Sequence, residues 1–208
     1  MSAITPSELR ARNLRTLAML AALFVLPLAL AFFTYYGTGW RPQAHVNHGE
    51  LIVPARPLPP IALPRIDPVT GSAAPRPGPQ AIPFQRHWSL VYVGSGDCPS
   101  ECRQALYVMR QTRLALNNDM TRVERVFLVT AACCDLRHLA DEHAGLQVLD
   151  ATAGAAAELL AQFPGAGREH TLFIVDPLGN LLMSYDARAN PSGLLQDLKK
   201  LLALSHIG

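Results

Sequence analysis

His87-Trp-Ser-Leu-Val-Tyr-Val-Gly94 leads directly into Cys98-Pro-Ser-Glu-Cys102, and this stretch decides the fold. The apolar run predicts a buried strand, and the residues from Arg103 to Leu116 have the spacing of an amphipathic helix. A strand that turns into a helix places both thiols at the helix N-terminus, where unpaired backbone N–H groups and the helix dipole favour thiolate over thiol. We predict that Asp97 caps this helix and that Pro99 lies in its first turn.

The sulfurs of Cys98 and Cys102 are expected on one face of the first helical turn, because the cysteines stand at i and i+4. That spacing lets them form a disulfide or share one soft metal ion. The neighbouring carboxylates of Asp97 and Glu101 disfavour the thiolate and favour a bound cation. A purely structural disulfide, or a pair of buried thiols, is the alternative. It is less favoured because structural bridges seldom lie at a strand-to-helix turn.

An apolar segment near the N-terminus predicts a membrane anchor. Residues 16–40 contain no charged residue, and Leu17 to Phe33 is almost entirely Leu, Ala, Phe, Met and Val, which is long enough to cross the ~30 Å hydrocarbon layer as a helix. The residues that orient this span are Arg10, Arg12 and Arg15 before it, and Tyr35, Tyr36 and Trp40 after it. The arginines keep residues 1–15 in the cytoplasm by the positive-inside rule, and the aromatic side chains suit the far interface.

A cleaved signal peptide is the rival interpretation of this segment. It is weaker because the apolar stretch exceeds the usual ~7–15 residues and its single small-x-small candidate, Ala29-Leu-Ala31, lies inside the apolar run. With an uncleaved anchor, the chain is a single-pass protein of the inner membrane of a Gram-negative cell, and its C-terminal domain is periplasmic. Cysteines there are oxidised unless something reduces them or a metal occupies them.

Composition divides the rest of the chain into a spacer and one domain. Residues 41–86 hold 11 of the 17 prolines, which predicts an extended, semi-rigid periplasmic linker without a core of its own. Residues 87–208 have the length of a single compact domain. The net charge is +2, and no basic stripe interleaved with aromatic residues is present, so nucleic acid is not a predicted partner.

Strand and helix patterns alternate beyond the cysteine helix. The expected strands are 123–130, 146–149, 171–175 and 181–185, and the expected helices are 135–143, 153–163 and 192–204. The loop Asp176-Pro-Leu-Gly-Asn180 marks an antiparallel hairpin. This order is that of an α/β, thioredoxin-like fold, a central mixed sheet flanked by helices. Right-handed crossovers place the ends of the first two parallel strands, and with them the dithiol, on one rim of the sheet.

The region from Trp88 to the C-terminus resembles the Sco/SenC family of membrane-tethered thioredoxin-like proteins, in the variant found with cytochrome oxidase assembly genes in proteobacteria. The matching segments are Leu90-Val-Tyr-Val-Gly94, Cys98-x3-Cys102, Ala105 to Arg113, Arg125-Val-Phe-Leu-Val-Thr130 and Val175-Asp-Pro-Leu-Gly-Asn180, with Asn47-His-Gly-Glu-Leu-Ile52 upstream. The resemblance implies delivery of copper to cytochrome c oxidase, or reduction of the cysteines of its dinuclear copper centre. The partner would be an oxidase subunit or its assembly proteins.

Sco proteins bind copper through the two cysteines of this motif and a distal histidine. The resemblance therefore implies Cys98 and Cys102 as metal ligands, and His170 is the candidate for the third. In thioredoxin-like folds the residue just before the first hairpin strand comes up against the dithiol, and His170 occupies that place. Two thiolates and one imidazole suit Cu(I), with Cu(II) as a second possibility. His170 stands slightly nearer the Asp-Pro turn than in typical Sco sequences, and a rim histidine hydrogen-bonded to backbone is the alternative.

The other histidines are not expected to bind metal. His138 and His143 fall on a short predicted helix and are interpreted as solvated, and His45 and His48 fall in the flexible spacer.

Cys133-Cys134 follows the strand that ends at Thr130, so it should share the rim with the first cysteine pair. Four thiols allow three connectivities, of which the vicinal one is the least favoured because adjacent cysteines bridge only with strain. This pair has two interpretations. The cysteines are either small apolar loop residues without a chemical role, or they act as resolving or metal-transfer thiols.

Two classes of function follow from the dithiol. A copper metallochaperone is favoured, because dedicated thiol–disulfide oxidoreductases normally use Cys-x2-Cys with a cis-proline, and this chain has neither. A periplasmic oxidoreductase that keeps oxidase or cytochrome cysteines reduced is the alternative, and a scaffold that binds no metal is a third possibility.

Overall fold

The computed structural model describes residues 6–37, 46–67, 73–74, 83–165, 168–205 and 207–208. The chain forms two compact units, one that ends at His45 and one that runs from Val46 to Gly208.

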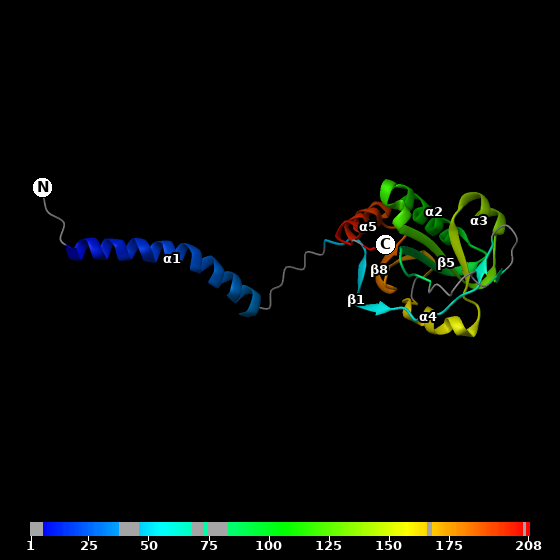
Figure 1. The fold of residues 1–208 in the computed structure, drawn as a ribbon, viewed down its shortest axis with the longest axis horizontal. Helices are drawn as coiled ribbons and strands as arrows, with labels where there is room; N and C mark the ends of the chain where they lie inside the picture. The colour runs from blue at the N-terminus through cyan, green and yellow to red at the C-terminus, as the bar shows by residue number, and fades with distance from the viewer. Residues whose placement is uncertain (1–5, 38–45, 68–72, 75–82, 166–167, 206) are drawn as a thin grey trace. The chain divides into compact units, whose positions relative to one another are not determined.

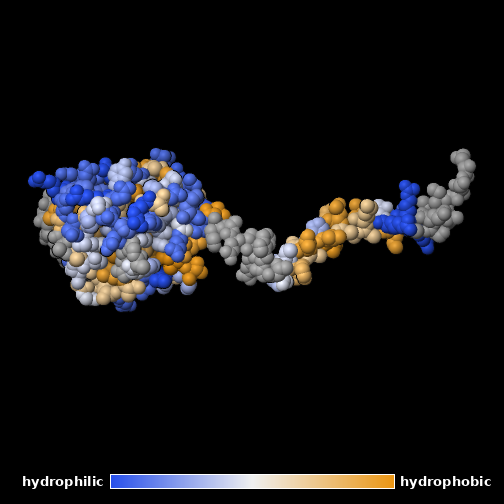
Figure 2. All heavy atoms as spheres, turned by 180° about the vertical axis from the view of Figure 1, so that it is seen from behind, coloured by the Kyte–Doolittle hydropathy of each residue, from blue (hydrophilic) through white to orange (hydrophobic). Residues whose placement is uncertain are grey.

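The first unit is the helix α1 (Pro6–Gly37). Its segment Arg12–Gly37 is 26 residues long and none of it is buried. At 1.5 Å per residue it is about 39 Å long, enough to cross the ~30 Å apolar layer of a membrane. Figure 2 shows apolar side chains along this helix and hydrophilic ones at its arginine-bearing end. The helix fits the predicted anchor through Gly37, whereas Trp40 lies outside the described residues.

The second unit is built on one eight-stranded mixed sheet, with the order β1-β8-β7-β4-β5-β6-β2-β3. Its strands are β1 (Glu50–Pro57), β2 (Arg65–Ile66), β3 (Ala73–Ala74), β4 (Trp88–Gly96), β5 (Val123–Cys133), β6 (Leu146–Asp150), β7 (Thr171–Val175) and β8 (Asn180–Asp186). The strands β4, β5 and β6 are parallel, and the remaining pairings are antiparallel. The parallel strands end on the same rim, as the crossover rule requires.

Helices cover both faces of this sheet. They are α2 (Ser100–Leu114), α3 (Leu136–Glu142), α4 (Ala157–Gln162) and α5 (Pro191–Leu204), with the 3₁₀ turns η1 (Asn117–Arg122), η2 (Gly154–Ala156) and η3 (Arg168–His170). Figure 1 shows α2, α3 and α5 on one side of the sheet and α4 on the other. The alternation of side chains along a strand creates two cores: Leu90 and Tyr92 of β4 face α2 and α5, whereas Val91 and Val93 face α4.

The predicted α/β, thioredoxin-like order of elements is confirmed from β4 to α5. The sheet also extends into the predicted linker. β1 pairs with β8 at one edge and β2 pairs with β6 near the other. Leu63, Ile66 and Phe84 are buried in the two cores. Pro54 and Pro57 are compatible with β1 because β1 is an edge strand, which can leave N–H positions unpaired. Much of the spacer expected at 41–86 therefore belongs to the folded unit.

Candidate functional site

Cys98 and Cys102 form a disulfide, with their α-carbons 5.0 Å apart. Both cysteines are fully buried in the core on the α2 side of the sheet. The sequence places the pair correctly between β4 and α2. The pair lies at the predicted rim, just beyond the end of β4, and the structure adds that both side chains are enclosed there.

The backbone turn before α2 differs from the prediction. Pro99 is the N-cap residue, no side chain caps the helix, and Asp97 is exposed. Cys98 has φ 45°, in the left-handed region that non-glycine residues seldom adopt. This conformation turns the chain from β4 into α2 and directs the Cys98 side chain into the core. Asp97 is therefore free to face the solvent beside the disulfide.

Arg103 holds this turn to the neighbouring loop. Its Nε donates to the Cys98 carbonyl at 3.2 Å, and its Nη2 donates to a carboxylate oxygen of Asp135 at 3.2 Å. Asp135 in turn caps α3 by accepting from the His138 N–H at 3.2 Å. This role of Arg103 was not predicted, although its position directly after Cys102 in the sequence could have indicated a contact with the cysteine turn. The arginine links the first cysteine to the loop that carries Cys134.

His170 ends η3, which packs against α2 and β4. Its carbonyl accepts from the Ala187 N–H at 2.7 Å, but its ring Nδ1 is buried and has no hydrogen-bond partner among the described residues. The lowered pKa of Glu101 arises first from its own backbone and the Ser100 hydroxyl, and His170 adds to it. The His170 segment thus lies beside the first turn of α2, the helix that contains Cys102.

In the disulfide form the two sulfurs are bonded to each other. Across the described parts of the chain, no three His, Cys, Asp or Glu side chains gather in an arrangement that holds a metal ion. The donor chemistry of this region fits a soft metal only after the disulfide is reduced, because reduction releases two sulfur donors.

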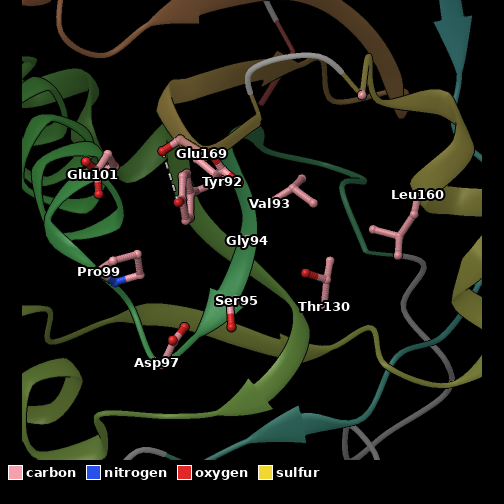
Figure 3. Close-up of a pocket in the computed structure, with 11 residues that line it drawn as sticks. Tyr92, Val93, Gly94, Ser95, Asp97, Pro99, Glu101, Thr130, Leu160 and Glu169 are labelled. Atoms are coloured by element: carbon pink, nitrogen blue, oxygen red, sulfur yellow. Dashed lines mark hydrogen bonds between the residues drawn. The ribbon is translucent and has the colours of Figure 1, made fainter.

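An acidic cleft of about 530 Å³ opens beside the disulfide turn. Figure 3 shows its residues: β4 supplies Tyr92, Val93, Gly94 and Ser95, and Asp97, Pro99, Glu101, Thr130, Leu160 and Glu169 surround them. The Tyr92 hydroxyl donates to the Glu169 carbonyl at 3.1 Å. Burial raises the pKa of Tyr92 to about 12, and the carboxylates of Glu169, Glu101 and Asp97 add to the rise. The tyrosine therefore remains neutral, and the cleft carries a negative charge.

Cys134 is disulfide-bonded. The Cys98–Cys102 bridge excludes both of those residues as its partner, so the two connectivities that join the cysteine pairs across the rim are wrong. The side chain of Cys133 lies outside the described residues.

The remaining histidines also differ from expectation. His143 is buried, and desolvation lowers its pKa to about 4, with His138 and Arg125 contributing. The His138 and His143 rings pack edge to face with centroids 5.1 Å apart, so neither is simply solvated. His48 is held by Asp197 rather than lying in a flexible tether. His45 lies outside the described residues.

Residues 88–205 match a protein family described as transmembrane-like, thioredoxin-like, C-terminal domain. Comparison with curated proteins gives no match. Among solved structures, the chain is similar to apo Sco1 from Thermus thermophilus, with 20% identity, a TM-score of 0.53, and coverage of 76% of this chain and 99% of that chain. Yeast Sco1 with copper bound has 14% identity and a TM-score of 0.52, with 71% and 95% covered. BsSco, a Sco-family cytochrome c oxidase assembly protein with a disulfide switch, has 12% identity and a TM-score of 0.51, with 77% and 99% covered. At these identities the likeness establishes a shared fold.

Proposed function

Since the chain belongs to the transmembrane-like, thioredoxin-like, C-terminal domain family, we propose that it is a membrane-tethered copper-binding assembly factor for cytochrome c oxidase. Copper is its cargo, and Cys98, Cys102 and His170 are the ligands that we assign. The observation that carries this proposal is the placement of the His170 segment against α2, with an unpartnered ring nitrogen beside the helix that begins at the cysteine pair. The similarity in fold to copper-bound yeast Sco1 supports it.

Copper binding requires the Cys98–Cys102 disulfide to be reduced first. An external dithiol supplies two electrons and two protons, the S–S bond breaks, and both cysteines become thiols while the donor becomes a disulfide. The thiols then lose their protons on binding the metal. Two thiolates and one imidazole nitrogen form a soft, low-coordinate donor set suited to Cu(I).

The acidic cleft supports a cationic cargo. Asp97, Glu101 and Glu169 line it next to the turn that holds Cys98. Carboxylates around a cleft raise the local concentration of cations and speed their arrival. The same charges disfavour free thiolates, so they favour a metal-bound dithiol over a reactive one.

The proposal includes the location of this site. The three arginines before the apolar segment of α1 orient the helix with its N-terminus in the cytoplasm, so the folded domain lies in the periplasm on the inner membrane. The partner is then an oxidase subunit or another assembly protein in that compartment.

An anaerobic Cu(I) titration of the reduced full chain tests the proposal. We expect one tight site in the parent protein, a loss of affinity of at least a hundredfold in Cys98→Ser and in Cys102→Ser, and weaker or spectroscopically altered binding in His170→Ala. His87→Ala is the matched control, because His87 is also partly exposed and precedes β4 at its opposite end from the disulfide. Unchanged affinity in both cysteine variants would eliminate the copper site.

The disulfide itself favours a second candidate, a thiol–disulfide oxidoreductase. The similarity in fold to BsSco, with its disulfide switch, supports a role for the oxidised form. Client reduction depends on thiolate fraction and access, so it should respond to changes at Asp97 and Glu101 more than to loss of the His170 ring. Measuring exchange with a dithiol client in the same variants separates the two functions.

A further inference from the structure

Arg125 is a buried cation whose hydrogen-bonding capacity is mostly unused. The residue is 4% exposed, and its Nε and Nη1 are buried with no hydrogen-bond partner among the described residues. The third guanidinium nitrogen, Nη2, donates to the Ala144 carbonyl at 2.6 Å. Native structures seldom leave a buried charge unpaired, because its desolvation is costly unless an opposite charge compensates it. Arg125 therefore points to an anionic partner that is not a part of the described chain.

The charged groups nearest Arg125 increase this positive field. The pKa of Arg125 is lowered to about 10, first by desolvation and then by the positive charges of Arg113 and Arg110. Arg113 is fixed by a hydrogen bond from its Nε to the Val123 carbonyl at 2.6 Å, and Arg110 is paired with Glu142 at 3.0 Å. These contacts hold the Arg110 and Arg113 guanidinium groups in defined positions.

These three arginines line a cavity of about 140 Å³ together with Leu114, Asp141, Glu142 and Ala144. At ~30 Å³ per water molecule it has room for roughly four waters, and it is smaller than the ~300–1,000 Å³ typical of organic-ligand sites. Glu142 is paired with Arg110, and Asp141 is exposed, so the three guanidinium groups outnumber the two carboxylates of the lining. The size and charge suit a single small oxyanion.

The cavity is separate from the disulfide site. Arg125 is the third residue of β5 and pairs in register with Leu90 near the start of β4, whereas Cys98 follows the end of β4. The parallel strands therefore place the arginines at one end of the sheet and the cysteines beyond the other. Nothing in the proposed copper chemistry uses the arginine end.

We propose that Arg110, Arg113 and Arg125 form a binding site for a phosphate-type oxyanion, either free phosphate or the phosphate of a lipid headgroup. Guanidinium groups suit such anions because their planar N–H donors make charge-assisted hydrogen bonds to several oxygens. An anion in this cavity compensates the buried charge of Arg125, which is one of the lining residues.

Thermal unfolding of the full chain in a maltoside detergent, which carries no phosphate, tests this site. Inorganic phosphate is titrated against sodium chloride of equal ionic strength, and phosphatidic acid is added to the micelles in a second arm. A ligand that binds the native state raises the unfolding midpoint in a saturable manner. We expect such a rise in the parent protein and at least a tenfold weaker apparent affinity in Arg125→Gln and Arg113→Gln.

Arg137→Gln is the matched control, because Arg137 is an exposed arginine on α3 outside the cavity. Arg113→Gln decides the result if Arg125→Gln fails to fold. A saturable response to phosphate identifies a free anion, and a response to phosphatidic acid alone identifies a lipid headgroup. Equal responses in all variants, or no response in either arm, would overturn the proposal.

Discussion

The Asp197 carboxylate in α5 accepts a hydrogen bond from the backbone N–H of His48 at 2.6 Å, and its second oxygen lies 3.2 Å from the His48 ring. The same carboxylate also accepts from the Gly49 N–H at 3.1 Å and from the Tyr185 hydroxyl. These contacts fix the start of the folded unit to its last helix, although the residues stand 149 positions apart. They position β1 for pairing along β8.

Replacing Asp197 with Asn should lower the free energy of unfolding by about 1–3 kcal/mol, because a buried acceptor of several hydrogen bonds loses its charge. Burial alone would raise the pKa of Asp197, but the hydrogen bonds from Tyr185, Gly49 and His48 outweigh it and lower the pKa. The contribution is therefore present above the ordinary carboxyl pKa of 3.8 and is lost as the pH falls below it. Denaturant unfolding at pH 7 and at pH 3 measures both effects. Glu158→Gln, an exposed carboxylate on α4, should change neither.

Gly49 provides a test of the same junction by steric exclusion. A β-carbon at this position would lie 2.3 Å from the Tyr185 ring, so Gly49→Ala must displace either the ring or the segment. We expect a loss of about 1–3 kcal/mol of stability. Gly154→Ala is the control, because nothing lies within 4 Å of its β-carbon and the gain in stability should be about 0.4–1 kcal/mol. Equal midpoints for the two variants in denaturant unfolding would contradict the close approach.

Loss of the Cys98–Cys102 bridge should affect stability as well as metal binding, since both residues are buried in the core. The double variant Cys98→Ala, Cys102→Ala should lose roughly 2 kcal/mol of unfolding free energy. Denaturant unfolding with and without a reductant measures this loss in the parent protein. The reductant also reduces the disulfide of Cys134. The change in unfolding free energy that the reductant causes in the double variant is therefore subtracted from the change that it causes in the parent protein. A parent protein equally stable in both conditions after that subtraction would refute a stabilising bridge.

His143 should make the stability depend on pH between about 6.5 and 4, a range that lies mostly above the ordinary carboxyl pKa values. Its pKa is lowered from 6.5 to about 4 in the folded state, so the unfolded chain takes up a proton first as the pH falls. Stability present above pH 6.5 is therefore lost progressively as the pH falls to about 4, by on the order of 3 kcal/mol.

Comparing pH profiles of thermal unfolding for the parent and His143→Phe isolates this contribution, because the variant cannot bind the proton. The control is His87→Gln, a partly exposed histidine beside Glu124. A parent profile that matches the His143→Phe profile between pH 4 and 6.5 would show that His143 does not stay neutral.

The apolar anchor helix and the alternation of elements from Trp88 to Leu204 could be predicted from the amino-acid sequence. Both are carried by local signals: hydrophobic period, turn residues and the length of each run. The place of Cys98 and Cys102 between a strand and a helix followed from the same signals, as did the position of His170 immediately before β7.

Which of these side chains are buried, and which residues they contact, depends on the packing of elements that are distant in the sequence. The proline-rich composition of residues 41–86 predicted a linker instead of β1 and β2. These strands form by pairing with β8 and β6, which are far away in the sequence. Burial of the disulfide depends on the left-handed turn at Cys98 and on the packing of α2, and neither has a local sequence signal. The isolation of Arg125 and the capture of His48 by Asp197 likewise arise from contacts between distant elements, which a pattern along the chain does not contain.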